Sequence, residues 1–196
     1  MANEASIKTV VTKFNKELDT ILDFIQQHRG TGKGVYVIYI YDYAVIKTFK
    51  DFEELLLNTI VGLISQEAPY IASPAGHKGT KSVKKKDAEN LFIGNKYFSF
   101  KGPNGLLKQI KTFFPTNHWF ISILSDTAYN KTFDVLIPLR NFAAHSSKTA
   151  KKNAINAVGF QQLGNSGAWL KVGSRFQNII DDLKDIAARI NAQAKF

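Results

Sequence analysis

Hydrophobic side chains recur every three or four positions through the first 28 residues, which is the spacing of one face of an α-helix. This pattern predicts an amphipathic helix over residues 4–28 that ends at Gly30. The glycine-rich segment that follows lacks the spacing of a phosphate-binding loop, because Gln27 stands where the first glycine belongs and Gly34 replaces the hydroxyl residue. We therefore interpret it as a helix-breaking turn.

The apolar positions of residues 35–66 cover a wider surface than one helix face. Residues 35–41 have the β-branched and aromatic composition of a strand, whereas the period from residue 44 onward is helical. Because no breaker separates the two parts, one long buried helix at the centre of a bundle is the simpler interpretation. A strand over residues 35–41 is the alternative.

The character of the chain changes at about residues 68–105, which we expect to be an irregular, basic insertion between the second and third helices. Prolines and glycines interrupt it, and its lysines include Lys84, Lys85 and Lys86. This lysine run either follows the phosphate backbone of RNA or is a solvated surface. Residues 97–100 are expected to form a short strand or an aromatic plug over the bundle.

Three further segments complete the predicted fold. A short helix over residues 106–114 stops at Pro115, and the next helix starts at Ser125 or Asp126 and continues toward His145. Pro138 lies inside that helix and either kinks or restarts it. Residues 146–173, which include Lys148, Lys151 and Lys152, are predicted to form a polar connection before a closing helix over residues 174–192. The sequence thus predicts a single all-α domain over residues 1–196, with four or five helices.

Composition narrows the classes of function. The 196 residues contain no cysteine, which excludes disulfides and thiolate metal sites, and the four histidines are too dispersed for metal-ligand spacing. We therefore expect neither a metal nor a cofactor. No signal peptide or membrane span is evident, so a soluble cytoplasmic protein without membrane contact is expected. The net charge of +10 arises mainly from lysine and suits either a nucleic-acid partner or a solubilising surface.

The segment Arg140–His145, which reads Arg-Asn-Phe-Ala-Ala-His, carries the chemistry that RNA cleavage without a metal requires. Arginine keeps its charge and can hold two phosphate oxygens, and histidine changes its protonation near neutral pH. On a straight helix Asn141 and His145 share a face, whereas Arg140 and His145 diverge by about 140°. The alternative is structural: Arg140 solvates the helix face or pairs with an acidic residue, and His145 ends the helix at the negative pole of its dipole.

The stretch Leu136–Ser146 resembles the signature of the HEPN superfamily, in which an arginine and a polar residue are followed by a histidine. The order of the predicted helices also resembles that family. The resemblance implies a homodimer in which two motifs line one composite active site, and a metal-independent endoribonuclease activity. It also implies a toxin–antitoxin or antiphage defence context, with an antitoxin or defence-system partner protein.

On this interpretation Arg140, Asn141 and His145 are the catalytic residues. His145 carries protons, Arg140 stabilises the charge that grows on the phosphate, and the resemblance implies that Asn141 orients the imidazole or the phosphate. Cleavage by the 2′-hydroxyl would leave a 2′,3′-cyclic phosphate. Two lysine groups are candidate RNA-binding residues: Lys148, Lys151, Lys152, Lys84, Lys85 and Lys86. The alternatives are a non-catalytic HEPN-like binding or dimerisation module and a basic nucleic-acid-binding helical protein.

Overall fold

The computed structural model describes residues 6–30, 34–67, 83–94 and 96–195, and every regular element among them is a helix. Four helices are long: α1 (Ile7–His28), α2 (Gly34–Glu67), α6 (Asn130–His145) and α9 (Arg175–Gln193). Five are short: α3 (Lys85–Ile93), α4 (Pro103–Ile110), α5 (Trp119–Leu124), α7 (Lys148–Val158) and α8 (Ser166–Leu170). The all-α prediction is confirmed, and the strand alternative for residues 35–41 is wrong. None of these helices combines the length and the apolar character needed to cross a bilayer.

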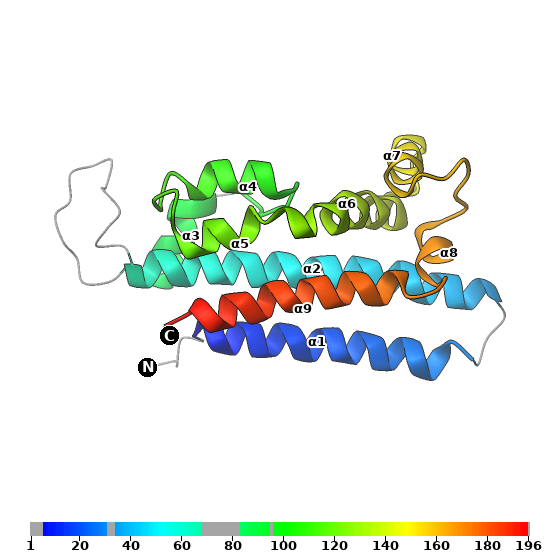
Figure 1. The fold of residues 1–196 in the computed structure, drawn as a ribbon, viewed down its shortest axis with the longest axis horizontal. Coiled ribbons are helices and arrows are strands. Elements are labelled where there is room, and N and C mark those ends of the chain that lie inside the picture. Colours follow the sequence, from blue (N-terminus) through cyan, green and yellow to red (C-terminus); the bar gives the residue numbers. More distant parts are fainter. Residues whose placement is uncertain (1–5, 31–33, 68–82, 95, 196) are drawn as a thin grey trace.

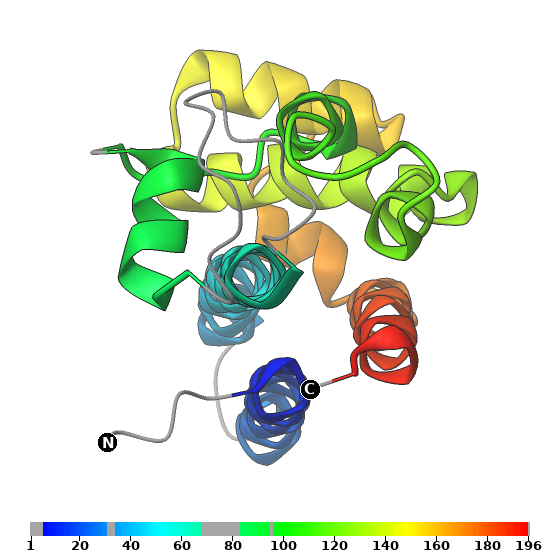
Figure 2. The ribbon, with the colours of Figure 1, turned by 90° about the vertical axis from the view of Figure 1, so that its left-hand side faces the viewer.

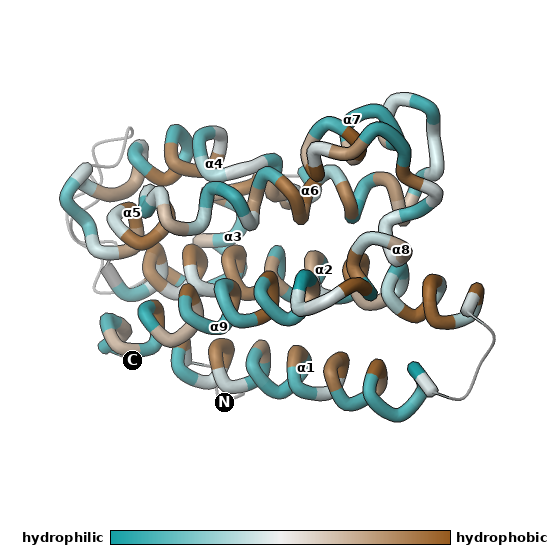
Figure 3. Tube along the Cα trace, turned by 45° about the vertical axis from the view of Figure 1, so that its right-hand side comes forward, coloured by the Kyte–Doolittle hydropathy of each residue, from teal (hydrophilic) through white to brown (hydrophobic). Residues whose placement is uncertain are grey.

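Helix α2 runs through the middle of the molecule and is covered from several directions. Helix α1 packs along it, and α9 packs against α1 and α5. Helices α3 to α7 lie on the side of α2 that faces away from α1 (Figures 1 and 2). Hydrophobic positions follow one another at successive turns of α2 (Figure 3). From Ala44 to Ile60 its buried residues cover about half of the helix circumference, and residues 61–65 are buried on every side, which explains the wide apolar surface of its pattern.

Polar side chains fix the start of α6 against α9. Thr132 donates a hydrogen bond to Asp182, and Tyr129 donates one to Asp185. Arg189 Nη1 lies 2.7 Å from Asp126 Oδ2, and the same carboxylate accepts a hydrogen bond from the backbone of Ala128. The Ala128 amide and the Arg189 guanidinium hold the pKa of Asp126 below its ordinary value. Asp126 therefore caps the 3-10 turn Thr127–Tyr129 that leads into α6, close to the predicted start of this helix.

The predicted aromatic plug has a structural counterpart at Phe100. Residues 97–100 form no strand, and the Phe100 ring is buried with its centroid 5.5 Å from that of Phe52 and 5.3 Å from that of Phe133. Its backbone amide donates a hydrogen bond of 2.7 Å to Glu53 Oε1. This loop therefore joins the core of α2 and α6.

Several predicted connections contain helices. Four or five helices were predicted, whereas the described residues form nine α-helices. The polar connection predicted over residues 146–173 contains α7 and α8, and the insertion predicted over about 68–105 contains α3 and the start of α4; residues 68–82 lie outside the described part. Three of the missed helices begin at a side-chain cap, because His118, Ser147 and Asn165 accept hydrogen bonds from the first turns of α5, α7 and α8, whereas α3 has no side-chain cap.

Helix α8 links α2 to the C-terminal half of α6. Ser166 Oγ donates a 2.6 Å hydrogen bond to the carbonyl oxygen of Leu139, and the amide of Gly167 donates one of 2.6 Å to Asp42 Oδ1. Burial raises the pKa of the Asp42 carboxyl, and the hydrogen bond from Gly167 acts in the opposite direction. A Cβ atom at Gly167 would lie 2.0 Å from the carbonyl oxygen of Ile38. Only glycine permits this close approach of α8 to α2.

We predict that Gly167→Ala destabilises the protein by about 1–3 kcal/mol, because the added methyl group must displace the α2 backbone or α8 itself. Urea denaturation followed by circular dichroism measures this change. Gly105→Ala in α4 is the matched control, since a Cβ there meets nothing within 4 Å and alanine favours a helix. Equal stability of the two variants would contradict the close approach of α8 to α2.

Candidate functional site

Helix α6 carries the motif residues at its C-terminal end. Phe133, Leu136, Leu139 and Phe142 are buried and hold the helix in the core. The helix continues through Pro138 to His145 without interruption, so a restarted helix after the proline is excluded. The packed face of α6 therefore fixes the backbone from which Arg140, Asn141 and His145 project.

Arg140 is half-buried and turns toward α2. Its guanidinium carbon lies 4.9 Å from the centroid of the Phe49 ring, and Nη1 donates a 3.0 Å hydrogen bond to Asn141 Oδ1. The structural alternative of a carboxylate partner fails among the described residues, because none forms an ion pair with Arg140. Its Nε is buried and has no hydrogen-bond partner. Arg140 is thus a cation held by an aromatic ring and an amide, with no carboxylate of the described residues paired to its charge.

Within one chain the side chain of Asn141 contacts Arg140. Its side-chain oxygen is used by the guanidinium of Arg140 rather than by the imidazole of His145. The reason is that the long arginine side chain can fold back over its neighbour, which a helical wheel of Cα positions does not represent. In this chain Asn141 therefore orients Arg140.

His145 is exposed and is the last residue of α6. Ser146 follows in the left-handed conformation, with φ of 48°, and its amide bonds to the carbonyl oxygen of Phe142. Ala144 is also exposed, so the backbone beside the imidazole is open. No described residue forms a hydrogen bond or ion pair with His145, and the ring is therefore accessible to a phosphate or a second chain.

Arg140 and His145 do not converge within one chain. Five residues of helix separate them by about 7.5 Å along the axis, and Arg140 points to α2 while His145 faces solvent. Phe49 is the residue that sequence reasoning missed. It lies 91 positions before Arg140, and a buried phenylalanine in an apolar helix carries no signal that it supports a cation.

The candidate RNA-binding lysines form two separate groups. Lys148, Lys151 and Lys152 are exposed and follow the i, i+3, i+4 spacing of one face of α7, opposite the buried Ala150 and Ala154. Since α7 begins three residues after His145 and packs on α6, this face adjoins the motif helix.

The other group belongs to α3 and its N-cap. Lys84 and Lys86 are exposed and Lys85 is half-buried. Helices α3 and α7 lie toward opposite ends of the long axis of the molecule (Figure 1). One chain therefore brings the α7 lysines, and not the α3 lysines, beside the motif.

The comparisons with known proteins find no match to a family model, a curated protein or a solved structure. The resemblance to the HEPN superfamily accordingly rests on the residues of α6. Among the described residues, no group of three or more histidine, aspartate or glutamate side chains is placed to hold a metal ion. The chemistry available at this site is that of a guanidinium, an amide and an imidazole.

We predict that Arg140→Met keeps the stability of the protein within about 1 kcal/mol or raises it, because methionine fills the space on Phe49 without a buried unpaired Nε. Urea denaturation measures the effect. The control is Arg189→Met, which removes the contacts to Asp126 and Tyr129 and should cost about 1–2 kcal/mol. A larger loss at Arg140 than at Arg189 would indicate that Arg140 has a structural role.

Proposed function

We propose that this chain is a metal-independent endoribonuclease of HEPN type that acts as a homodimer in the cytoplasm. The observation that carries the proposal is the uncompensated guanidinium of Arg140, which Phe49 and Asn141 hold on the same helix as an exposed imidazole. A half-buried arginine whose Nε is buried without a partner, and which no described carboxylate pairs, is unfavourable for folding unless a ligand supplies the anion. A phosphate is the anion that the guanidinium geometry fits best.

The proposed reaction uses the ribose itself as the nucleophile. The 2′-oxygen loses its proton to an imidazole, attacks the adjacent phosphorus and forms the new P–O bond, while the bond to the 5′-oxygen breaks and that oxygen takes up a proton. His145 acts as the base, the acid or both, and Arg140 stabilises the charge on the non-bridging oxygens. The products are a 2′,3′-cyclic phosphate and a 5′-hydroxyl.

The divergence of Arg140 and His145 within one chain supports a composite site. A second copy related by a two-fold axis near His145 would place the arginine of one subunit near the histidine of the other. The lysine faces of both α7 helices would then flank the RNA. In this proposal the enzyme belongs to a toxin–antitoxin or defence system, with a partner protein that controls it.

One observation favours a second candidate function. The close contact of Arg140 with Phe49 leaves Nε buried, and an arginine that stays in this position would bind RNA poorly. In that case the chain is a non-catalytic HEPN-like module that binds RNA through the α7 lysines. A measurement of RNA cleavage distinguishes the ribonuclease from the non-catalytic module.

We predict that His145→Ala lowers the rate of RNA cleavage by at least about 10³-fold while far-UV circular dichroism and RNA affinity stay unchanged, because the exposed ring contributes to proton transfer and not to the core. A 5′-labelled oligoribonucleotide with EDTA in the buffer is the substrate. The same oligonucleotide with deoxyribose at the cleaved position should resist cleavage, since its nucleophile is missing.

Mixing the inactive variants His145→Ala and Arg140→Met tests the composite site. The mixed dimers retain one intact arginine and one intact histidine, so part of the activity should return, whereas either variant alone stays inactive. Cleavage by His145→Ala at the wild-type rate would refute the assignment of the imidazole. A monomer in light scattering at micromolar concentration would refute the two-fold site.

We predict that the combined change of Lys148, Lys151 and Lys152 to Ala weakens RNA binding. The negative slope of log K against log salt should become shallower by about 2, because up to three phosphate contacts are lost. The matched control is the combined change of Lys84, Lys85 and Lys86 to Ala, which removes the same charge toward the opposite end of the molecule. Fluorescence anisotropy at several salt concentrations compares them. Equal losses would mean that RNA follows charge alone rather than the α7 face.

A further inference from the structure

The lysine face of α7 ends at an exposed aromatic side chain. Gly159 closes the helix with φ of 68°, and its amide bonds to the carbonyl oxygen of Asn156. The amide of Phe160 bonds to the carbonyl oxygen of Ile155, as this type of left-handed helix ending requires. Ile155 lies on the same side of α7 as the three lysines, so the ending holds Phe160 against the end of the lysine face.

Arg175, the first residue of α9, contacts this ring and a second one. Its guanidinium carbon is 5.3 Å from the centroid of the Phe160 ring and 4.6 Å from a ring centroid of Trp169. Its Nη1 also donates a 3.1 Å hydrogen bond to the carbonyl oxygen of Trp169, which packs against the core. We call these three side chains the Arg175 cluster. The cluster supports the Phe160 ring from within the protein, while 46% of Phe160 stays exposed.

The part of the chain that forms this surface contains no carboxylate. No acidic residue occurs between Asp134 and Asp181, although sixteen acidic residues spread evenly over 196 positions would place several there. The same stretch contains six basic residues: Arg140, Lys148, Lys151, Lys152, Lys171 and Arg175. The ion pairs among the described residues all lie elsewhere. The positive charge of this surface is therefore not balanced within its own segment.

The carboxylates of the neighbouring helices do not balance this charge either. Three accept hydrogen bonds from other described residues: Asp42 on α2, and Asp181 and Asp182 on α9. Two on α1, Asp19 and Asp23, line a separate hollow that does not include the Arg175 cluster. Asp134 lies about 16 Å along α6 from His145, beyond the end that leads into α7.

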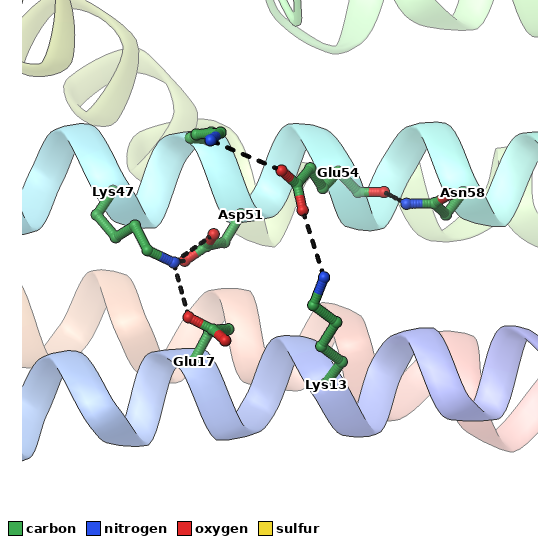
Figure 4. Close-up of polar contacts among 7 residues, drawn as sticks. Lys13, Glu17, Lys47, Asp51, Glu54 and Asn58 are labelled. Carbon is green, nitrogen blue, oxygen red and sulfur yellow. Dashed lines mark hydrogen bonds and ion pairs between the residues drawn. The ribbon is translucent and has the colours of Figure 1, made fainter. Parts of the chain in front are cut away.

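The α1–α2 surface shows the opposite arrangement. There Lys47 Nζ lies 2.7 Å from Glu17 Oε2 and 2.6 Å from Asp51 Oδ2, and Lys13 Nζ lies 3.8 Å from Glu54 Oε2 (Figure 4). Lysines on that side of the molecule thus have carboxylate partners from the same two helices. On the α7 surface the expected counter-charge is an anion from outside the chain.

The combination of cations with an exposed ring indicates which anion fits. A strand of phosphates matches a row of lysines, and an unpaired base can stack on an aromatic ring. An RNA duplex keeps its bases stacked on one another and presents mainly phosphates and 2′-hydroxyls. An acidic peptide supplies carboxylates without a planar group at each repeat. Single-stranded RNA therefore uses more of this surface than either alternative.

We propose that α7 and Phe160 bind single-stranded RNA, with phosphates along the lysine face and one unpaired base stacked on the Phe160 ring. Arg175 and Trp169 are positioning residues, because they hold that ring and need not touch the RNA. The eleven residues of α7 span about 16 Å, so the stacked base lies about this far from the motif at the end of α6. The proposal rests on the RNA binding in our proposed function and does not depend on cleavage.

The test separates stacking from charge with two probes that the protein cannot cleave. One is a fluorescein-labelled 2′-O-methyl oligoadenylate of about ten nucleotides, and the other is a labelled abasic strand of equal length and charge. Phe160→Leu keeps an apolar side chain at the helix ending but removes the aromatic face, and Phe160→Trp keeps that face. Phe24→Leu is the matched control, because Phe24 is 39% exposed on α1.

Fluorescence anisotropy at several salt concentrations gives the affinities. We expect Phe160→Leu to weaken binding of the oligoadenylate about tenfold, because base stacking on a side chain contributes about 1–3 kcal/mol. Its affinity for the abasic strand and its salt slope should stay unchanged, since no phosphate contact is lost. Phe160→Trp and Phe24→Leu should bind both strands like the wild type.

Stacking on Phe160 is overturned if Phe160→Leu binds the oligoadenylate like the wild type, or if it loses as much affinity for the abasic strand. It is also overturned if Phe24→Leu causes the same loss. A wild-type protein that shows the expected pattern but does not cleave unmodified RNA would contradict the ribonuclease and support the stacking site. A wild-type protein that binds neither strand would refute RNA as the partner and both proposals with it.

Discussion

The burial of α2 is the constraint on which the rest of this structure depends. A 34-residue helix whose apolar surface covers about half of its circumference is stable in water only if other helices cover that surface. Helices α1, α3, α6 and α8 do so along most of its length. The cover is incomplete at the N-terminal end of α2, where Tyr36, Tyr39 and Tyr43 stay exposed to solvent. The exposed tyrosines therefore lie where the described helices leave α2 uncovered.

The same helix determines the environment of the candidate catalytic arginine. Phe49 projects from α2 toward α6, and its ring provides the surface on which the guanidinium of Arg140 rests. Asn141 fixes the plane of that guanidinium, while Nε remains buried without a partner. An arrangement that forgoes a hydrogen bond in the core is expected where a residue is retained for function rather than for stability.

Sequence alone determined the all-α class, the long helices α1, α2 and α9, the continuation of α6 to His145 and the motif residues, because these depend on periodicity and on residue identity within a short segment. It missed the short helices α3, α5, α7 and α8, of which the last three begin at the side-chain caps His118, Ser147 and Asn165. Only the tertiary structure decided that Phe49 lies under Arg140, that Asn141 serves the arginine rather than the histidine, and that the two lysine groups lie far apart. The first and last of these relations depend on how helices distant in sequence pack, and packing leaves no mark on the local order of residues. The contact between Arg140 and Asn141 depends on the side-chain conformations of two neighbouring residues.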